Sequence, residues 1–592
     1  MKPEEYYNEI IRRSETALAV LRRRAFAVAM LRLAVFVLTV AACFTVEGAA
    51  LVVACLVAGL AIFLWLAKAG NRIAMAKSVE QAKIDRTKLN IDRLNLKFDN
   101  LPEGREYIDA THDFTFDIDV FGSHSLYSLL NSTSTEGGSR KLAGWLIDPK
   151  SVSGNLHLRQ EAIQELSGND EFRLRMVSIG HVVADEVKES KVIDSSIPDF
   201  SINPMWRIAV KVIPFVFIAM FALMAIDIIP GILIFYMFLA TLIVGSAQAK
   251  RVGRLHEWLS RYVKRLSSCS DIFKTIESEQ FQSQLLRSLQ SEVKTEAGSA
   301  STLTARLARH IHNLDQRYNA FGYAIMNGFL LWDLRQLDNI DKWMKANGEN
   351  IEKWNNAIAE FDALCALAVF RFNNPDYVFP TEDSTGKTII KAKDAGHPLI
   401  PAGNCVCNDI DTLRLSEFFI VTGANMAGKS TYLRTIAVNY LLAMIGAPVF
   451  AKSMVFTPAT LYTGLRASDS LSDGASYFFA ELKRLQTVVK RAESGEKMLV
   501  ILDEILRGTN SADKQKGSLG LVRKLVDLPV AGIIATHDLA LGSLAESFPG
   551  RVRNFRFEAE ISGDKLTFSY HVLPGIAENT NAYYLMQTMG II

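Results

Sequence analysis

Four long apolar runs constrain the fold of this chain more than any other feature of its sequence. They form two pairs, 25–46 with 49–67 and 212–226 with 228–244, and a very short turn joins the members of each pair. A helix needs about 20 apolar residues to cross the hydrocarbon core of a bilayer. Each pair therefore predicts a transmembrane hairpin. Buried helices of a soluble protein remain the alternative, more so for the shorter second pair.

The charges that flank these runs predict their orientation. Lysine and arginine residues stand at the outer ends of both pairs and are absent from the two turns. They are Arg22, Arg23, Arg24, Lys68, Arg72, Arg207, Lys211, Lys250, Arg251 and Arg254. Because cytoplasmic flanks carry an excess of Lys and Arg, both hairpins are expected to enter from the cytoplasm and return to it. The sequence thus predicts a multi-pass protein of the cytoplasmic (inner) membrane.

Composition narrows the class of protein further. Of the 592 residues, 49% are hydrophobic and 22% are charged, which excludes a disordered chain. Lys and Arg total 65 against 63 Asp and Glu, so any surface that binds nucleic acid must be local. Among six cysteines, Cys405 and Cys407 form a lone C-x-C, and without a second pair they indicate free thiols rather than a metal site.

The texture of the sequence changes near residue 380. Residues 250–370 have helical periodicity with little Pro or Gly, whereas short β-rich runs follow at 418–421, 498–502 and 532–535, with helical stretches between them. This alternation predicts an α/β domain with a buried parallel sheet. Aromatic residues in the helical part are expected to lie in the core rather than to stack on bases. They are Tyr318, Phe321, Tyr323, Phe329, Trp332, Trp343, Trp354 and Phe361.

The strongest motif follows the first β-rich run. Residues 423–430, GANMAGKS, match the phosphate-binding pattern G-x-x-x-x-G-K-[ST], and a predicted helix over 431–442 follows. Backbone N–H groups of such a loop close around phosphate, Lys429 reaches the β- and γ-phosphates, and Ser430 ligates Mg²⁺. The expected nucleotide-binding residues are Gly423, Ala424, Asn425, Met426, Ala427, Gly428, Lys429, Ser430 and Thr431.

Acidic and imidazole side chains follow the next two β-rich runs. Asp503 is expected to hold Mg²⁺ together with Ser430, and Glu504 to orient and deprotonate the attacking water. His537 is expected to sense the γ-phosphate and polarise that water. Glu504 and His537 are thus the candidate catalytic residues. Solvated acids at a strand end and a structural histidine are the alternatives.

A serine- and glycine-rich stretch, 468–476, precedes a predicted helix from Tyr477. Hydroxyls and backbone donors at a helix start can form a second anion site, with Ser472, Gly474 and Ser476 contacting the nucleotide of another subunit. An ordinary N-capped loop is the other interpretation.

Together these motifs resemble the MutS family of mismatch-repair ATPases. Residues 422–434, TGANMAGKSTYLR, resemble the family's TGPNMxGKSTYLR, and residues 502–509, LDEILRGT, resemble its LDEIGRGT. Residues 467–481 are similar to the family's serine-glycine loop, which completes the partner's ATP site in a dimer. Residues 125–149 resemble the start of its helical core domain. The resemblance implies ATP as substrate, Mg²⁺ as cofactor and a homodimer formed through the ATPase domains.

The resemblance also has departures. MutS mismatch sensors carry an N-terminal domain with a Phe-x-Glu wedge, and residues 1–24 contain no Phe. The second apolar pair lies where the family builds its lever helices and DNA clamp. The chain is therefore expected to be a membrane-anchored MutS relative that lacks the mismatch-recognition domain.

We expect an ABC-type α/β P-loop ATPase domain at the C-terminus, preceded by an all-α core and lever and by two transmembrane hairpins. The expected segments are a cytoplasmic helix (1–24), hairpin 1 (25–67), a helical core-like region (68–205), hairpin 2 (206–249), a helical lever region (250–379) and the MutS-type ATPase domain (380–592).

Two interpretations of purpose follow. In the first, the ATPase dimer acts on DNA, for which the basic stretches 250–265 and 306–312 are suitable, although lipid headgroups suit them as well. In the second, the same ATPase drives a membrane machine that has lost DNA binding. A transporter is a weaker third reading, because the hairpins are few and short and carry only Asp227 as a polar site.

Overall fold

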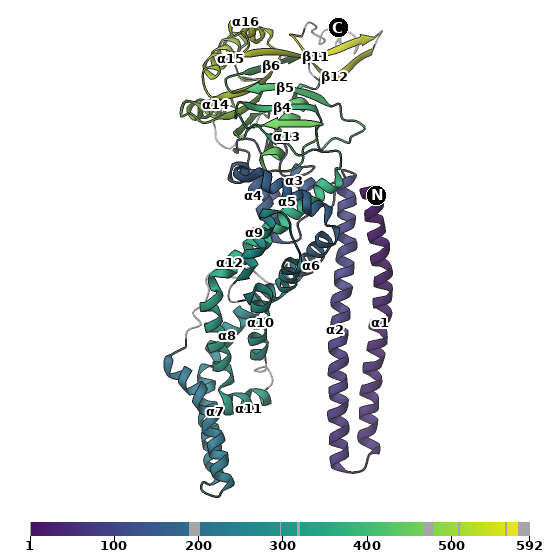
Figure 1. Ribbon diagram of the computed structural model, residues 1–592, viewed down its shortest axis with the longest axis vertical. Coiled ribbons are helices and arrows are strands. Elements are labelled where there is room, and N and C mark those ends of the chain that lie inside the picture. Colours follow the sequence, from purple (N-terminus) through teal and green to yellow (C-terminus); the bar gives the residue numbers. More distant parts are fainter. Residues whose placement is uncertain are drawn as a thin grey trace.

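The computed structural model describes residues 2–188, 202–295, 298–315, 320–424, 426–466, 477–506, 509–562 and 565–577. Figure 1 shows an α/β head that contains the C-terminal part of the chain, a helical middle region, and two helical legs that extend to the same side, away from the head.

The first leg is a hairpin of two very long helices, α1 (Pro3–Thr45) and α2 (Ala49–Leu94). Each of these helices contains a polar half and an apolar half without a break between them. The boundary expected at residue 24, between the cytoplasmic helix and hairpin 1, therefore falls inside α1. Gly59 allows the two helices to approach closely, since a Cβ there would lie 2.2 Å from Thr39 Oγ1. The guanidinium of Arg32, a cation within the first apolar run, lies over the ring of Phe63 at 4.8 Å.

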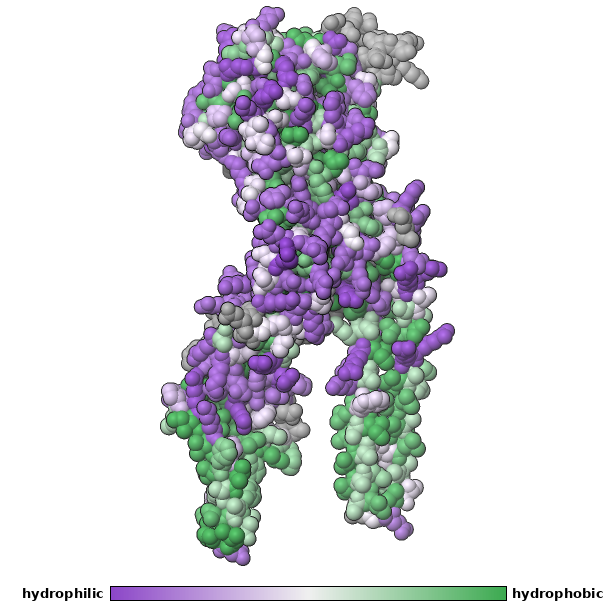
Figure 2. Space-filling model, in the orientation of Figure 1, coloured by the Kyte–Doolittle hydropathy of each residue, from purple (hydrophilic) through white to green (hydrophobic). Residues whose placement is uncertain are grey.

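The second leg consists of α7 (Pro204–Ala225) and the first part of α8 (Gly231–Ser278). Each of the four leg helices contains a stretch long and apolar enough to cross a membrane, judged by length and composition. At most 17% of any such stretch is buried inside the protein, so most of their side chains face outward. Figure 2 shows the result as apolar surface over the far part of both legs, whereas the head and middle are mainly polar.

Helices build the middle region. They are α3 (Leu126–Leu130), α4 (Glu136–Ile147), α5 (Leu156–Gly168), α6 (Asp170–Lys188), α9 (Gln284–Val293), α10 (Ala300–Leu314), α11 (Ala320–Leu330) and α12 (Trp332–Asn373), with 3₁₀ turns at Arg105–Tyr107 and Pro149–Asn155. Two antiparallel strands of two residues each, β1 (Lys294–Thr295) and β2 (Gly298–Ser299), lie between α9 and α10. At 42 residues, α12 is about 63 Å long and reaches from the second leg to the base of the head (Figure 1).

The expectation that the aromatic residues of this region lie in the core is confirmed in part. Trp343, Trp354 and Phe361 are buried. Phe321 is not, because 76% of it is exposed, and the prediction for this residue is wrong. Tyr318 lies outside the described residues.

The head contains a six-stranded sheet in the order β12-β11-β6-β10-β9-β8. Its strands are β6 (Phe418–Gly423), β8 (Thr460–Gly464), β9 (Met498–Asp503), β10 (Val530–Thr536), β11 (Val552–Ser562) and β12 (Lys565–Pro574). All neighbours pair in parallel except β11 and β12. The buried parallel sheet is therefore confirmed, with one unforeseen antiparallel edge strand.

Helices cover both faces of this sheet, which explains why β6, β9 and β10 are buried along their full length. One face packs on α13 (Lys429–Met444), and the other on α14 (Tyr477–Glu493), α15 (Ser511–Val526) and α16 (Leu544–Ser547), which follows a 3₁₀ turn at Leu539–Ser543.

A second sheet, which the sequence did not predict, lies between the first sheet and the middle region (Figure 1). Its order is β3-β7-β4-β5, formed by β3 (Thr381–Glu382), β4 (Thr388–Ala395), β5 (Asn408–Arg414) and β7 (Ser453–Phe456). Strand β4 pairs antiparallel with both of its neighbours.

Candidate nucleotide site

The parallel sheet brings the predicted site residues together at one edge. Strand β10 lies between β6 and β9, with Thr536 opposite Thr422 and Ala535 opposite Asp503. Parallel neighbours end on the same side, so the residues that follow these three strands meet outside their carboxyl ends.

The loop between β6 and α13 needs glycine at its two ends. Gly423 has a φ of 151° and Gly428 a φ of 104°, both in the region that side chains disfavour. A Cβ on Gly423 would also lie 2.7 Å from the carbonyl oxygen of Phe557 on β11. Helix α13 begins at Lys429, two residues earlier than predicted, so the backbone N–H groups of its first turn face the loop.

Lys429 holds a positive charge inside this loop. The lysine is buried, and its Nζ donates to the carbonyl oxygens of Gly423 at 2.7 Å and Ala424 at 2.8 Å. Burial lowers the pKa of Lys429, while the carboxylates of Asp503 and Glu504 act in the opposite direction. These two acceptors are neutral carbonyl groups, so an anion that enters the loop would bind the ammonium more strongly than they do.

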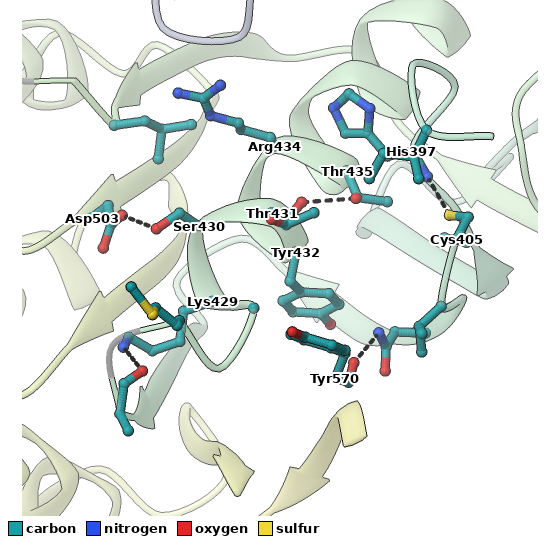
Figure 3. Close-up of a pocket in the computed structure, with 18 of the residues that line it drawn as sticks. His397, Cys405, Lys429, Ser430, Thr431, Tyr432, Arg434, Thr435, Asp503 and Tyr570 are labelled. Carbon is teal, nitrogen blue, oxygen red and sulfur yellow. Dashed lines mark hydrogen bonds between the residues drawn. The ribbon is translucent and has the colours of Figure 1, made fainter. Parts of the chain in front are cut away.

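Ser430 and Asp503 form the oxygen pair expected for a magnesium ion. The hydroxyl of Ser430 donates to Asp503 Oδ2 at 2.6 Å (Figure 3). Hydroxyl and carboxylate oxygens suit Mg²⁺, which keeps several water or phosphate ligands of its own. Within the described part of the chain, no group of three or more His, Cys, Asp or Glu side chains could hold a metal by themselves. The donor set therefore fits a magnesium ion that a phosphate also binds.

Glu504 and His537 are paired beside this group. His537 Nε2 lies 2.9 Å from Glu504 Oε1 and 3.3 Å from Lys429 Nζ. An ionised carboxylate can only accept, so we assign the proton to His537 Nε2, which donates to Glu504. This contact holds the carboxylate in place.

The turn that carries Glu504 is strained and held at both ends. Glu504 and Leu506 have φ values of 50° and 61°, which are uncommon for residues with side chains. Glu504 N donates to Ala535 O at 2.9 Å, and Leu506 N donates to Glu481 Oε1 at 2.7 Å. Glu481 belongs to the segment expected to serve the partner subunit, yet in this chain it fixes the turn of its own subunit.

A cavity of about 660 Å³ extends from the phosphate loop to a less polar end. His397, Cys405, Val406 and Tyr570 line that end, and Figure 3 shows Tyr570 and Tyr432 beside the loop. The Asn408 side chain joins β5 to β12, since its amide nitrogen donates to Tyr570 O at 2.9 Å and its Oδ1 accepts from Val572 N at 2.8 Å. None of these residues is among the predicted site residues, and Tyr570 carries no local signal that could have placed it there.

A carboxylate of the middle region reaches the site. Asp119 accepts a hydrogen bond from Arg434 on α13 at 2.7 Å and another from Arg466 at 2.6 Å. Arg434 follows the phosphate loop by one helical turn, and Arg466 immediately precedes the serine-rich stretch in the sequence. Asn425, Ser472, Gly474 and Ser476 lie outside the described residues, so their predicted roles remain predictions.

His397 is expected to lower the stability of the head at acid pH. Its imidazole is buried and accepts from Leu399 N through Nδ1 at 3.3 Å. Burial, aided by Arg434 and opposed by Asp119, lowers the pKa of His397 from 6.5 to about 4. Between these values the unfolded chain binds a proton that the folded chain does not, so stability is present above pH 6.5 and falls as the pH drops toward 4.

We expect the loss across this window to be on the order of 3 kcal/mol. His397→Asn is expected to unfold with a weaker pH dependence than the unchanged protein over this range, because asparagine does not titrate. Denaturant unfolding at a series of pH values measures both, and equal slopes would contradict the assignment.

The fold and site define an α/β domain whose glycine-bounded turn, 423–428, joins a buried parallel strand to a helix and lies beside two carboxylates. Residues 419–591 match the family model for MutS domain V, and residues 108–368 match that for MutS domain III. The chain belongs to the MutS family.

Curated relatives named DNA mismatch repair protein MutS are similar to part of the chain. The relative from Natronomonas pharaonis is 32% identical over 247 residues, which cover 41% of this chain and 28% of the relative. Those from Caldicellulosiruptor bescii and Clostridium botulinum are 30% and 29% identical, over 42% and 43% of this chain and 29% and 27% of the relatives. The matched segments therefore span less than a third of these relatives.

Proposed function

We propose that this protein is a membrane-anchored, MutS-like ATPase that binds and hydrolyses ATP as a homodimer and acts on DNA. The observation that carries the ATPase proposal is the convergence of Lys429, Ser430, Asp503, Glu504 and His537 on one cavity. The relatives, which are named DNA mismatch repair protein MutS, support the part of the proposal that concerns DNA.

The phosphates of ATP would lie in the loop between Gly423 and Gly428, with Lys429 exchanging its two carbonyl partners for phosphate oxygens. Ser430 and Asp503 would hold Mg²⁺, which neutralises charge on the phosphates when bound. The base would lie toward Val406 and Tyr570, the less polar end of the cavity. Nothing among these residues reads the base, so the preference for ATP rests on the family.

Hydrolysis would depend on Glu504. Its carboxylate accepts a proton from the attacking water, whose oxygen bonds to the γ-phosphorus as the bond to ADP breaks. His537 positions the carboxylate through the 2.9 Å contact. With ATP bound, the same Nε2–H would be shared with the attacking water and would polarise it.

The site would be completed in a dimer. Ser472, Gly474 and Ser476 of one subunit would contact the nucleotide of the other. Closure on ATP could reach the middle region through the bridge from Asp119 to Arg434 and Arg466.

Both legs would cross the cytoplasmic membrane, with the head and the middle region in the cytoplasm. The support is the outward-facing apolar surface of the four leg helices and the cations at their cytoplasmic flanks. Under this proposal the six expected segments retain their boundaries, with the polar halves of α1 and α2 continuing out of the membrane.

A second candidate function is a mechanochemical membrane ATPase that does not bind DNA. One observation favours it, because the ends of the molecule farthest from the head carry apolar rather than basic surface (Figure 2). Such ends suit lipid and not a phosphate backbone.

ATP turnover by the solubilised dimer separates the two candidates. We would measure phosphate release without DNA, with homoduplex DNA, and with mismatched or branched DNA, each at two salt concentrations. Binding to DNA phosphates weakens steeply with salt, so stimulation that fades at the higher salt concentration supports the DNA-linked function. Turnover that no DNA alters favours the membrane machine, and the absence of turnover contradicts the ATPase proposal.

A further inference from the structure

Helix α11 (Ala320–Leu330) is a short apolar helix beside the second leg. Its sequence, AFGYAIMNGFL, contains no charged residue. At 11 residues it is about 16 Å long, too short to cross a bilayer. An apolar helix of this length is usually buried in a protein core or lies at a membrane surface. The exposure of its side chains decides between these two environments.

Three apolar side chains in the first seven residues of α11 are exposed. Phe321 is 76% exposed, Ile325 39% and Met326 37%. This pattern excludes a core helix. In Figure 2 the apolar surface of the second leg continues without interruption onto the region where Figure 1 places α11.

The C-terminal end of α11 is packed tightly on the leg. The Phe329 ring lies 5.0 Å from the ring of Phe217 on α7 and 4.9 Å from that of Phe238 on α8. The hydroxyl of Thr241 on α8 donates to Gly328 O. Gly328 permits this approach, because a Cβ there would lie 2.1 Å from the Phe238 ring. The helix is therefore held at a fixed height on the leg.

That height corresponds to the upper part of the apolar band. Phe217 lies six residues beyond Lys211, an exposed flanking cation of α7, or about 9 Å farther along the helix axis. Helices that lie in a membrane surface place their apolar face about 5–10 Å into the boundary between headgroups and acyl chains. The contact with Phe217 thus sets α11 at the depth of such a helix.

The turn after α11 is satisfied from within the protein. Leu331 has a φ of 47°, and Leu331 N donates to Asn327 O at 3.2 Å. The buried Asn327 side chain accepts from Asp333 N at 3.0 Å. Trp332 follows, with its indole N–H donating to Asn313 O at 2.9 Å. Backbone groups near lipid must be paired internally, and tryptophan is enriched at membrane surfaces.

We infer that α11 lies in the cytoplasmic surface of the bilayer, with Phe321, Ile325 and Met326 against phospholipid, as a fifth membrane-contacting element. This inference rests on the proposal that the legs cross a membrane. It gives α12 a fixed base, because α12 begins immediately after α11 and ends under the head. Motion of the head would then be transmitted to the membrane surface along α12.

Photocrosslinking to lipid tests the inference. The photoreactive residue p-benzoylphenylalanine would replace one phenylalanine at a time in the full chain, reconstituted in bilayers of phosphatidylethanolamine and phosphatidylglycerol. The three positions are Phe321, Phe215 on α7 and Phe479 on α14 of the head, all well exposed. Phe215 reports on the leg, and Phe479 is the matched control away from any membrane. Mass spectrometry would detect phospholipid adducts, and gel electrophoresis would detect crosslinked dimers.

We expect phospholipid adducts at positions 321 and 215 and none at 479. Adducts at 215 but not at 321 would overturn the inference while leaving the anchoring legs intact. A crosslinked dimer at 321 in place of a lipid adduct would also overturn it, since the exposed face would then be covered by a second copy of the chain. The absence of adducts at both 321 and 215 would contradict the membrane proposal itself and this inference with it.

Discussion

Replacing Glu504 with glutamine is expected to lower ATP turnover by about 10²- to 10⁴-fold while ATP still binds. Glutamine has nearly the same size, and its side-chain oxygen can still accept from His537 Nε2, which lies 2.9 Å from Glu504 Oε1. It cannot take a proton from water. Lys429 and Ser430 are unchanged, so the phosphate loop keeps its charge and hydroxyl. The measurements are steady-state phosphate release and the binding of a fluorescent ATP analogue.

Two further variants make this result specific. Glu493→Gln removes an exposed carboxylate of the same domain that pairs with Lys524 at 2.7 Å, and turnover should not change. Lys429→Ala should lose both binding and turnover, because it removes the cation inside the loop. If Glu504→Gln hydrolyses ATP at the normal rate, Glu504 is not the base. If both Glu504→Gln and Lys429→Ala are normal, the cavity is not the ATP site.

That Lys429, Asp503 and His537 lie together could be expected from the sequence, because the signals for them are local. Each group follows a buried strand directly, and parallel strands end at the same edge of a sheet. Strand order was not needed to expect that Lys429, Asp503 and His537 would meet. In the structure the predicted strands and the helix after the loop are longer by one or two residues at an end, as is usual for element boundaries.

The other end of the cavity depends on contacts between residues far apart in the chain. Asn408 and Tyr570 are separated by 162 positions and meet only because β12 turns back against β11. The bridge from Asp119 to Arg434 spans 315 positions. Neither contact leaves a periodic or motif-like trace, so hydrophobic patterning could not reveal them.

Phe321 shows a different limit of sequence reasoning. Apolar periodicity tells which residues avoid water but not whether protein or lipid covers them. Trp354 and Phe361 are covered by neighbouring helices, whereas Phe321 faces outward from a helix docked on an apolar leg. The two environments favour the same side chains, and only the arrangement of the helices distinguishes them.

Replacing Asp362 with alanine is expected to destabilise the middle region by about 2–5 kcal/mol, because each buried donor left without an acceptor costs about 1–3 kcal/mol. Asp362 on α12 is fully buried, and its carboxylate accepts from the backbone N–H and hydroxyl groups of both Ser134 and Thr135, at distances between 2.6 and 3.1 Å. Thr135 is the N-cap of α4, so the carboxylate also lies at the positive end of that helix. Alanine would leave these donors buried without an acceptor, which costs more than the hydrogen bonds themselves contribute.

Burial raises the pKa of Asp362, and the hydrogen bonds donated by Ser134 and Thr135 act in the opposite direction. The stability that Asp362 contributes therefore depends on these donors. Thr135→Val should therefore cost less than Asp362→Ala, because it removes one donor and leaves the remaining hydrogen bonds to Asp362 in place.

Gly138→Ala should also destabilise the middle region. A Cβ on Gly138 would lie 2.3 Å from Asp362 Oδ2 and would push the carboxylate away from its donors. Denaturant unfolding followed by tryptophan fluorescence measures these changes, since Trp145 lies on α4 and Trp343 and Trp354 lie on α12. An Asp362→Ala protein with unchanged stability would mean that this carboxylate does not join α12 to α4.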